Sequence, residues 1–307
     1  MDGIIIINKP KGMTSHDVVV EVRRITGERS CGHTGTLDPD ATGVLVVCMG
    51  RATRLSRFMM ETPKEYEAVI VFGISTDTGD ASGKVVAVSE DVKVPRERVF
   101  EAFQRFVGDI EQIPPMVSAV RHRGRRLYEL AREGITVERE PRRVTIYEIE
   151  PASLEDWPEV VRLGSQGSMR VVCSKGTYIR TLCEDICASI GIEGHMGALE
   201  RTASSGFRLS EACTLNELRQ AAAYGEFDNL VRPIVEGVGH MPKCVVSEDE
   251  ASRIKHGTQI EWDPNRAEPV CGIGDYIELL GADGALVAVG EVRLMDGRAL
   301  IQPRVVL

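Results

Sequence analysis

The chain has 307 residues, of which 43% are hydrophobic and 27% charged, a composition that can bury a large core and excludes a disordered chain. This length predicts one large domain and one small domain. The net charge of −9 argues against a nucleic-acid partner for the surface as a whole, because phosphate contacts need Lys and Arg. With no apolar stretch long enough to span a membrane, no basic signal segment and no C-x-x-C pair among eight cysteines, we expect a soluble cytoplasmic protein without bound metal.

The charge is unevenly distributed along the chain. Residues 121–143 contain eight arginines and four glutamates, whereas residues 243–307 contain seven Lys or Arg and eleven Asp or Glu. A basic segment on an acidic body would direct a polyanion to one face of the molecule. A solvated helix face is the alternative interpretation, and charge alone leaves both open.

The first elements can be predicted from apolar runs and helix-capping patterns. Residues 3–8 are apolar and β-branched, which predicts a buried strand that ends in a turn. Thr14 and Asp17 form a capping-box pattern, so we expect a helix that ends at Gly27. The glycines and the proline of residues 31–43 interrupt both periodicities and predict a loop.

Two further helices are predicted. Residues 96–107 place an apolar stripe that includes Val107 toward the core, and residues 177–190 form the second helix, with Arg180 in its first turn. Because the helix dipole disfavours a cation there, we expect Arg180 to have a carboxylate partner. The arginine-rich segment between these helices is expected to be a helix or a flexible arm. Strands are expected at residues 44–49, 65–72, 170–174, 276–280, 286–294 and 299–306.

Two segments could carry chemistry. Asp38 lies in the glycine-rich loop, where it could act in catalysis or merely cap backbone N–H groups in an Asx-type turn. The loop has neither a terminal Gly-Lys-Ser/Thr nor G-x-G-x-x-G spacing, so no nucleotide cofactor is expected. In the second segment Lys175 and Arg180 lie on either side of Gly176, which indicates an anion site at a helix start or an ordinary strand-to-helix turn.

Sequence motifs extend along almost the whole chain. They are Asn8–His16, Gly32–Pro39, Ala41–Gly43, Lys64–Tyr66, Gly73 with Thr76–Thr78, Pro114–Pro115 with Ser118–Ala119, Cys173–Arg180, Leu199 with Arg201–Thr202, and Gly206–Phe207. In their number and order they resemble the motifs of bacterial TruB-type tRNA pseudouridine-55 synthases. The chain departs from the pattern at Met116–Val117, where an aromatic residue commonly precedes the serine, and at Arg121, where lysine is common.

The resemblance implies an α+β pseudouridine synthase fold over residues 1–240, with a mixed, largely antiparallel sheet flanked by helices. It implies a small, β-barrel-like PUA-type RNA-binding domain over residues 243–307, where short β-rich pieces follow a change in composition. Residues 121–143 would be an insertion that closes over RNA. The implied activity is conversion of uridine 55 in the T arm of tRNA to pseudouridine. We expect a monomer without cofactor or obligatory protein partner.

The resemblance also implies roles for individual residues. Asp38 matches the catalytic aspartate, Arg180 the arginine that pairs with it, and Tyr66 the tyrosine that stacks on the target uracil. The other substrate-binding positions are His33, which helps to displace the base, Tyr178 and Leu199, which line the pocket, and Lys9, Arg121 and Arg123.

A single carboxylate is sufficient to catalyse this reaction. Breaking the N1–C1′ bond and rejoining the base through C5 needs no reductant and no energy source. Asp38 must be ionised, and Arg180 is expected to lower its pKa. The target base must first leave the base stack of the RNA. This step needs an aromatic side chain on which the base can stack, such as Tyr66, and a side chain that fills the gap left in the RNA, such as His33.

Three alternatives stay open from the sequence. A guide-RNA-dependent synthase related to dyskerin would act only in a ribonucleoprotein, but residues 121–143 and the short C-terminal region favour the stand-alone class. A tRNA-binding chaperone with an inactive site conflicts with the presence of all matched catalytic residues. A metal-dependent hydrolase would use His33, Asp38 and Asp40, which lack the spacing that converges on one ion.

Overall fold

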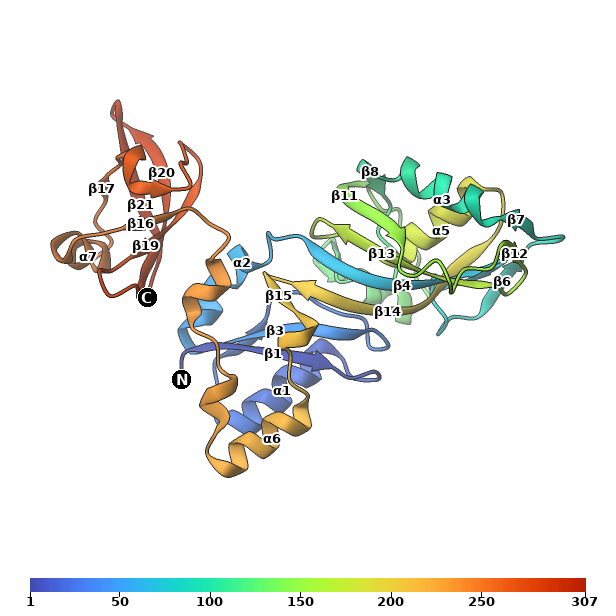
Figure 1. Ribbon diagram of the computed structural model, residues 1–307, viewed down its shortest axis with the longest axis horizontal. Coiled ribbons are helices and arrows are strands. Elements are labelled where there is room, and N and C mark those ends of the chain that lie inside the picture. Colours follow the sequence, from blue (N-terminus) through green and yellow to red (C-terminus); the bar gives the residue numbers. More distant parts are fainter.

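The computed structural model describes all residues 1–307, and its largest element is a nine-stranded sheet (Figure 1). Seven strands follow the order β1-β3-β14-β4-β13-β11-β8, while β2 pairs with β3 and β15 with β14. The β14–β3 pair is parallel and the other pairs are antiparallel, as expected. The strands are β1 (Gly3–Lys9), β2 (Cys31–His33), β3 (Thr42–Met49), β4 (Lys64–Phe72), β8 (Gly108–Gln112), β11 (Arg142–Pro151), β13 (Gln166–Cys173), β14 (Gly194–Ser204) and β15 (Phe207–Arg208).

Strand β1 carries four consecutive isoleucines, Ile4–Ile7, which are buried on both faces of the strand. Ile5 and Ile7 pack against helices α1 and α6, whereas Ile4 and Ile6 belong to a cluster on the opposite face. Helices α3 and α5 cover the other end of the sheet, where they contribute to the largest hydrophobic cluster. The helices are α1 (Ser15–Thr26), α2 (Ser56–Met59), α3 (Arg96–Arg105), α4 (Leu127–Arg132), α5 (Ile179–Ser189), α6 (Leu215–Tyr224) and α7 (Glu248–Lys255).

Local capping explains why α1 lies where the sequence predicts it. The Thr14 side chain accepts a hydrogen bond from the Asp17 N–H, and the Asp17 carboxylate accepts one from the Thr14 N–H. Gly27 ends the helix with a φ of +71°, a left-handed conformation that glycine adopts without strain. Both predicted ends of this helix are confirmed.

Three local expectations were wrong in detail. Residues 31–43 are not entirely loop, because Cys31–His33 pairs with β3. Helix α3 ends at Arg105, so Val107 leaves the apolar stripe and is 43% exposed. Helix α5 begins only at Ile179, because the chain turns at Gly176, whose φ is +82°.

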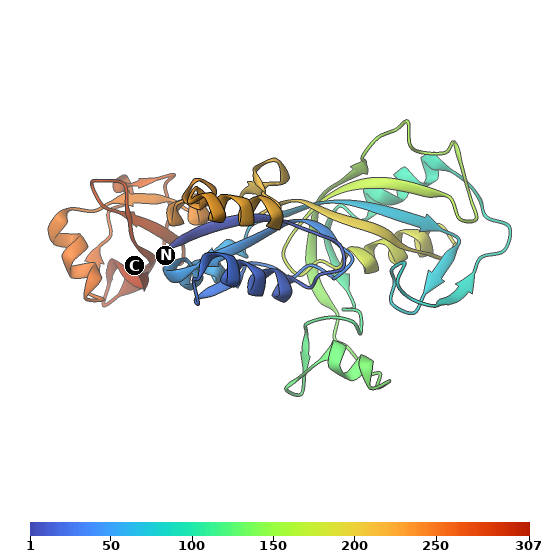
Figure 2. The same cartoon turned by 90° about the horizontal axis from the view of Figure 1, so that it is seen from below.

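The arginine-rich segment forms an arm that projects from the body of the molecule (Figure 2). It consists of a short hairpin, β9 (Arg121–His122) and β10 (Arg125–Arg126), followed by α4. Leu127 and Leu130 of α4 are buried. The arm therefore has a small apolar core, and only residues 127–132 of the arginine-rich segment are helical. Two further antiparallel pairs, β5 (Ile74–Thr76) with β6 (Val85–Val88) and β7 (Lys93–Pro95) with β12 (Val160–Arg162), lie outside the large sheet.

The C-terminal residues form a separate lobe around a curled six-stranded sheet in the order β17-β21-β20-β19-β16-β18. This half-barrel agrees with the expected PUA-type fold, and the three predicted C-terminal strands are confirmed. A small apolar cluster that includes Phe58, Met241 and Val289 joins the lobe to the rest of the molecule. The strands are β16 (Lys243–Val245), β17 (Ile260–Glu261), β18 (Ala267–Glu268), β19 (Tyr276–Leu280), β20 (Leu286–Met295) and β21 (Arg298–Val306).

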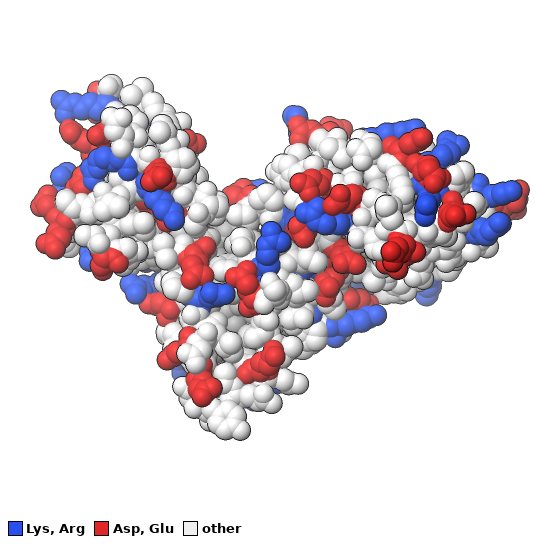
Figure 3. All heavy atoms as spheres, viewed as in Figure 1, with Lys and Arg blue, Asp and Glu red and all other residues white.

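Charged side chains are scattered over the face shown in Figure 3 and do not form a single basic patch there. Figure 3 shows Lys and Arg interspersed with Asp and Glu over both the body and the C-terminal lobe. None of the helices combines the length and the apolar character that a membrane crossing needs.

Candidate active site

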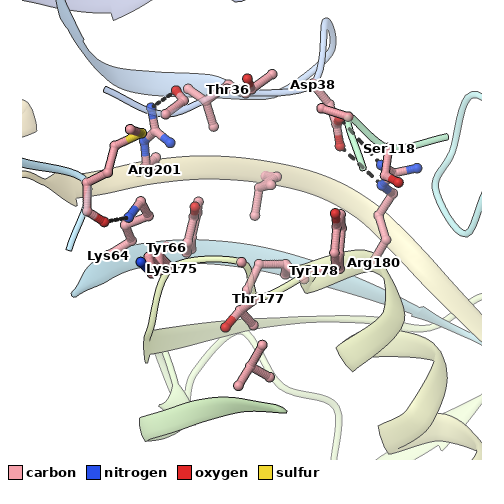
Figure 4. Close-up of a pocket in the computed structure, with 18 of the residues that line it drawn as sticks. Thr36, Asp38, Lys64, Tyr66, Ser118, Lys175, Thr177, Tyr178, Arg180 and Arg201 are labelled. Atoms are coloured by element: carbon pink, nitrogen blue, oxygen red, sulfur yellow. Dashed lines mark hydrogen bonds and ion pairs between the residues drawn. The ribbon is translucent and has the colours of Figure 1, made fainter. Parts of the chain in front are cut away.

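A cleft of about 490 Å³ opens over the central strands β4 and β14. Its walls come from the loop after β2, the turn before α5 and the root of the arm, segments that are far apart in the sequence. Figure 4 shows Asp38, Arg180 and Ser118 at one end of the cleft and Tyr66 and Lys64 at the other. A concave site of this size with a few converging polar groups is typical of a small-molecule or nucleotide pocket.

The loop that carries Asp38 is held against the turn between β1 and α1. The Ser15 hydroxyl accepts a hydrogen bond from the Leu37 N–H at 2.8 Å, and its own proton can reach the Leu37 carbonyl at 3.2 Å. The Gly12 N–H donates to the Pro39 carbonyl at 2.8 Å. These contacts on both sides of Asp38 fix its backbone and direct its side chain into the cleft.

Lys9 supports the same loop from inside the protein. Its side chain is fully buried, and its ammonium donates to the carbonyls of Met13 at 2.6 Å, Pro10 at 2.9 Å and Pro39 at 2.9 Å. Burial lowers the pKa of Lys9 to about 8. Because all three ammonium donors are used within the protein, the structure places Lys9 as a support of the Asp38 loop and not as a group that contacts substrate.

Asp38 and Arg180 form the ion pair that the sequence analysis expected. Arg180 Nε lies 3.1 Å from Asp38 Oδ2, and Arg180 Nη2 donates to Asp38 Oδ1 at 3.4 Å. The arginine side chain is 5% exposed and the aspartate side chain 38%. The guanidinium is therefore part of the protein interior, and the carboxylate is the member of the pair that faces the cleft.

Arg180 also joins two other segments to the site, which the sequence analysis did not predict. Its Nη1 donates to the Thr78 carbonyl at 3.1 Å, and its Nη2 donates to the Val117 carbonyl at 2.8 Å. Asp80 Oδ2 lies 3.7 Å from Nη1. Arg180 lies in the first turn of α5, and the expectation that it needs a carboxylate partner there is confirmed twice, by Asp38 and by Asp80.

The protonation of Asp38 depends on two opposing effects. Burial in the cleft raises the pKa of Asp38 above its usual range, and the nearby Asp80 carboxylate adds to this effect. The Arg180 guanidinium lowers the pKa but does not outweigh burial. The arginine therefore shifts the pKa of Asp38 in the expected direction, while burial makes the net shift upward in the free protein.

Tyr66, Tyr178 and Leu199 all line the cleft, as the resemblance implied. Tyr66 comes from β4 and is 7% exposed. Burial raises the pKa of its hydroxyl, and Arg201 only partly opposes this. A neutral phenol is thus the stable form at physiological pH, and the ring offers an apolar surface on which a base could stack.

Two cationic side chains at the same end of the cleft as Tyr66 were not assigned a role from the sequence. Arg201 is 1% exposed, and it donates from Nε to the Val44 carbonyl at 2.8 Å and from Nη2 to the Gly35 carbonyl at 3.0 Å. Lys64 donates to the Met60 carbonyl at 3.1 Å. The Arg201 contacts tie β14 to β3 and to the glycine-rich loop, whereas the Lys64 contact holds the chain before β4. The only signal in the sequence was the presence of both residues in the quoted motifs.

Gln112 is a further residue that the sequence analysis missed. Its amide is 1% exposed, accepts a hydrogen bond from the Tyr178 N–H at 2.9 Å and donates to the Tyr178 carbonyl at 3.3 Å. This double contact fixes the backbone two residues before Arg180. No local pattern predicts it, because Gln112 and Tyr178 are distant in the sequence.

Besides Lys9, three predicted substrate-binding residues lie outside the cleft. His33 is on β2, where its Nδ1 accepts a hydrogen bond from the Gly35 N–H at 3.3 Å, and burial together with the nearby Arg201 lowers its pKa. Arg121 and Arg123 are exposed on the arm. The structure therefore separates them from Asp38, and any contact with a substrate would be to parts of it beyond the target base. No three His, Cys, Asp or Glu side chains converge as metal ligands.

Comparisons with known proteins identify the family of the chain. The family model for the N-terminal domain of TruB family pseudouridylate synthases matches residues 23–179. The model for the C-terminal domain of tRNA pseudouridylate synthase B matches residues 180–238. Together they span the Asp38 loop, the cleft and α5.

The chain is similar to tRNA pseudouridine synthase B of Geobacillus thermodenitrificans, with 46% identity over 84% of this chain and 85% of that protein. It is 39% identical to tRNA pseudouridine synthase B of Pelotomaculum thermopropionicum over 95% of this chain and 91% of that protein. Among solved structures, a Cbf5-Nop10-Gar1 complex contains a chain with a TM-score of 0.76 and 26% identity, over 99% of this chain and 83% of that one. The chain belongs to the TruB family of pseudouridine synthases, and it is an isomerase of that family.

Proposed function

We propose that the protein converts uridine 55 in the T arm of tRNA to pseudouridine, with Asp38 as the catalytic carboxylate. The observation that carries this proposal is the ion pair itself, a partly exposed carboxylate held by a buried guanidinium at the end of a cleft of nucleotide size. The relatives named above are tRNA pseudouridine synthases, which supports tRNA as the substrate.

The reaction exchanges one glycosidic bond for another. The N1–C1′ bond of the uridine breaks, the base turns, C5 bonds to C1′, and the C5 proton is replaced by a proton on N1, so the formula is unchanged. Ionised Asp38 either adds to the nucleotide or assists removal of a proton. Arg180 orients the carboxylate and favours its charged form while excluding water from that side of the pair.

The nucleotide must leave the RNA stack to reach Asp38. The Tyr66 ring supplies a stacking surface inside the cleft, and Tyr178 and Leu199 complete its apolar lining. His33 lies outside the cleft and has a lowered pKa, so it would enter the gap that the flipped base leaves in the RNA stack as a neutral ring. A neutral imidazole can stack between bases without the cost of desolvating a charge.

RNA outside the target nucleotide would contact two further parts of the chain. We assign residues 1–240 to the catalytic domain, with the arm at residues 121–143 as an RNA-contacting insertion, and residues 243–307 to an RNA-binding domain. The exposed Arg121 and Arg123 of the arm suit phosphate contacts. The protein would act as a cytoplasmic monomer, without a protein partner or cofactor.

A guide-RNA-dependent mode is the second candidate, because the structural relatives include Cbf5 in complexes with other proteins. The relatives that are 39–47% identical and named tRNA pseudouridine synthase B favour the stand-alone mode. Purified protein mixed with an unmodified tRNA transcript separates the two modes. Pseudouridine at position 55 supports the proposal, whereas formation only after addition of a guide RNA or other proteins refutes it.

The role of Asp38 is tested with an Asp38→Asn variant. We expect at least a thousandfold loss of turnover, roughly the cost of removing an essential catalytic side chain, with retained tRNA binding. Asp40→Asn is the matched control, because Asp40 is an exposed carboxylate on the same loop outside the Arg180 pair, and we expect it to remain active. Continued turnover by Asp38→Asn would refute the mechanism. Pseudouridine formation by the parent protein on tRNA with cytidine at position 55 would refute the target.

A further inference from the structure

Ser118 contributes an unpartnered hydroxyl to the wall of the cleft. The residue is 7% exposed, and its Oγ is buried without a hydrogen-bond partner. It lies at the root of the arm, beside the Asp38–Arg180 pair (Figure 4). Buried hydroxyls are normally hydrogen-bonded, because leaving one unpaired destabilises the folded state. An exception at this position therefore needs a physical reason.

The backbone around Ser118 is already fully engaged. The Ser118 N–H donates to the Met116 carbonyl at 3.0 Å, and the Ser118 carbonyl accepts from the Tyr128 N–H at 3.1 Å. The preceding carbonyl, that of Val117, accepts from Arg180 Nη2 at 2.8 Å. The arm root is thus fixed to the catalytic ion pair, and only rotation about the Cα–Cβ bond can bring the hydroxyl to a new partner.

We propose that the Ser118 hydroxyl donates a hydrogen bond to an oxygen atom of the target nucleotide when that nucleotide enters the cleft. The inference rests on the proposed function, because it requires a flipped uridine beside Asp38. The 2′-hydroxyl of the ribose and the two carbonyl oxygens of uracil can all accept such a bond. Because Arg180 holds both Asp38 and the residue before Ser118, this contact aligns the nucleotide with the carboxylate.

The test compares the Ser118→Ala and Ser118→Thr variants with the parent protein on a T-arm stem-loop RNA. We expect Ser118→Ala to lower kcat/KM roughly three- to tenfold, the effect of one neutral hydrogen bond. Its melting temperature should be unchanged or higher, because the variant removes an unpaired buried hydroxyl. Ser118→Thr keeps the hydroxyl and should restore most of the activity.

Ser204→Ala is the matched control. Ser204 is 1% exposed and its Oγ also has no partner, but it lies on β14 outside the lining of the cleft. We expect an unchanged or higher melting temperature and parental kcat/KM. The inference is overturned if Ser118→Ala keeps parental kcat/KM, or if it loses kcat/KM and melting temperature together, since the hydroxyl would then be structural.

The partner oxygen is identified from dissociation constants for the same RNA with uridine or 2′-deoxyuridine at the target position. Non-additive effects of Ser118→Ala and the deoxy substitution identify the 2′-hydroxyl, and additive effects identify a base oxygen. Parent activity is measured first, with mapping of the modified position. A parent that modifies another uridine refutes the position-55 proposal, and the Ser118 comparison is then made on that uridine.

Discussion

Replacing Glu278 by glutamine should stabilise the protein in a pH-dependent manner. Glu278 lies on β19, fully buried, and both of its carboxylate oxygens lack a hydrogen-bond partner. Its neighbours across the sheet are Lys243 on β16 and Val289 on β20, and Val289 belongs to the cluster that joins the C-terminal lobe to the body. Burial raises the pKa of Glu278 to about 7, although Lys243 opposes the rise.

The size of the effect follows from the two pKa values. The ordinary pKa of glutamate is 4.5 and the folded value is about 7. At about 1.4 kcal/mol per pH unit, the ionised group destabilises the folded protein by roughly 3 kcal/mol at pH 8. Because the folded-state pKa is raised, this cost grows as the pH rises from 4.5 toward 7, and at pH 5 it is below about 1 kcal/mol.

The measurement is the free energy of unfolding from urea titration at pH 5 and pH 8. Glu278→Gln should exceed the parent by roughly 3 kcal/mol at pH 8 and by less than about 1 kcal/mol at pH 5. Glu261→Gln, at an exposed site of the same sheet, should change the value by less than about 0.5 kcal/mol at either pH. An equal gain at both pH values, or a loss at pH 8, would refute the reasoning.

Two further variants examine the Asp38 loop and its ion pair. Lys9→Met leaves three backbone carbonyls without their common hydrogen-bond donor. We therefore expect the unfolding free energy to fall by about 2–4 kcal/mol and single-turnover conversion of the RNA to become slower. An unfolding free energy equal to that of the parent would contradict the role of Lys9 as a support of the Asp38 loop. Arg180→Lys weakens the ion pair that lowers the pKa of Asp38, so the pKa of Asp38 should rise further. The acidic limb of the profile of kcat/KM against pH should then move to higher pH. An unmoved limb would show that ionisation of Asp38 does not control the rate.

Much of the secondary structure could be predicted from local patterns. Helix α1 begins and ends where Thr14, Asp17 and Gly27 place its caps, because capping involves only groups a few residues apart. Three of the six strands of the C-terminal sheet, β19, β20 and β21, follow from apolar runs between turns. The need of Arg180 for an anionic partner was predictable for a similar reason, since the helix dipole acts within the first turn.

The groups that surround the Arg180 guanidinium depend on the tertiary structure. Local patterns pointed to an aspartate in a glycine-rich loop and an arginine at a helix start as candidates, and the resemblance to TruB-type synthases implied that the two pair. The fold added Asp80 and the carbonyls of Thr78 and Val117 around the same guanidinium. It also buried Asp38 enough to raise its pKa despite Arg180, and it placed Lys9 inside the protein. Burial and contacts between distant segments depend on how the whole chain packs, and no local spacing records them.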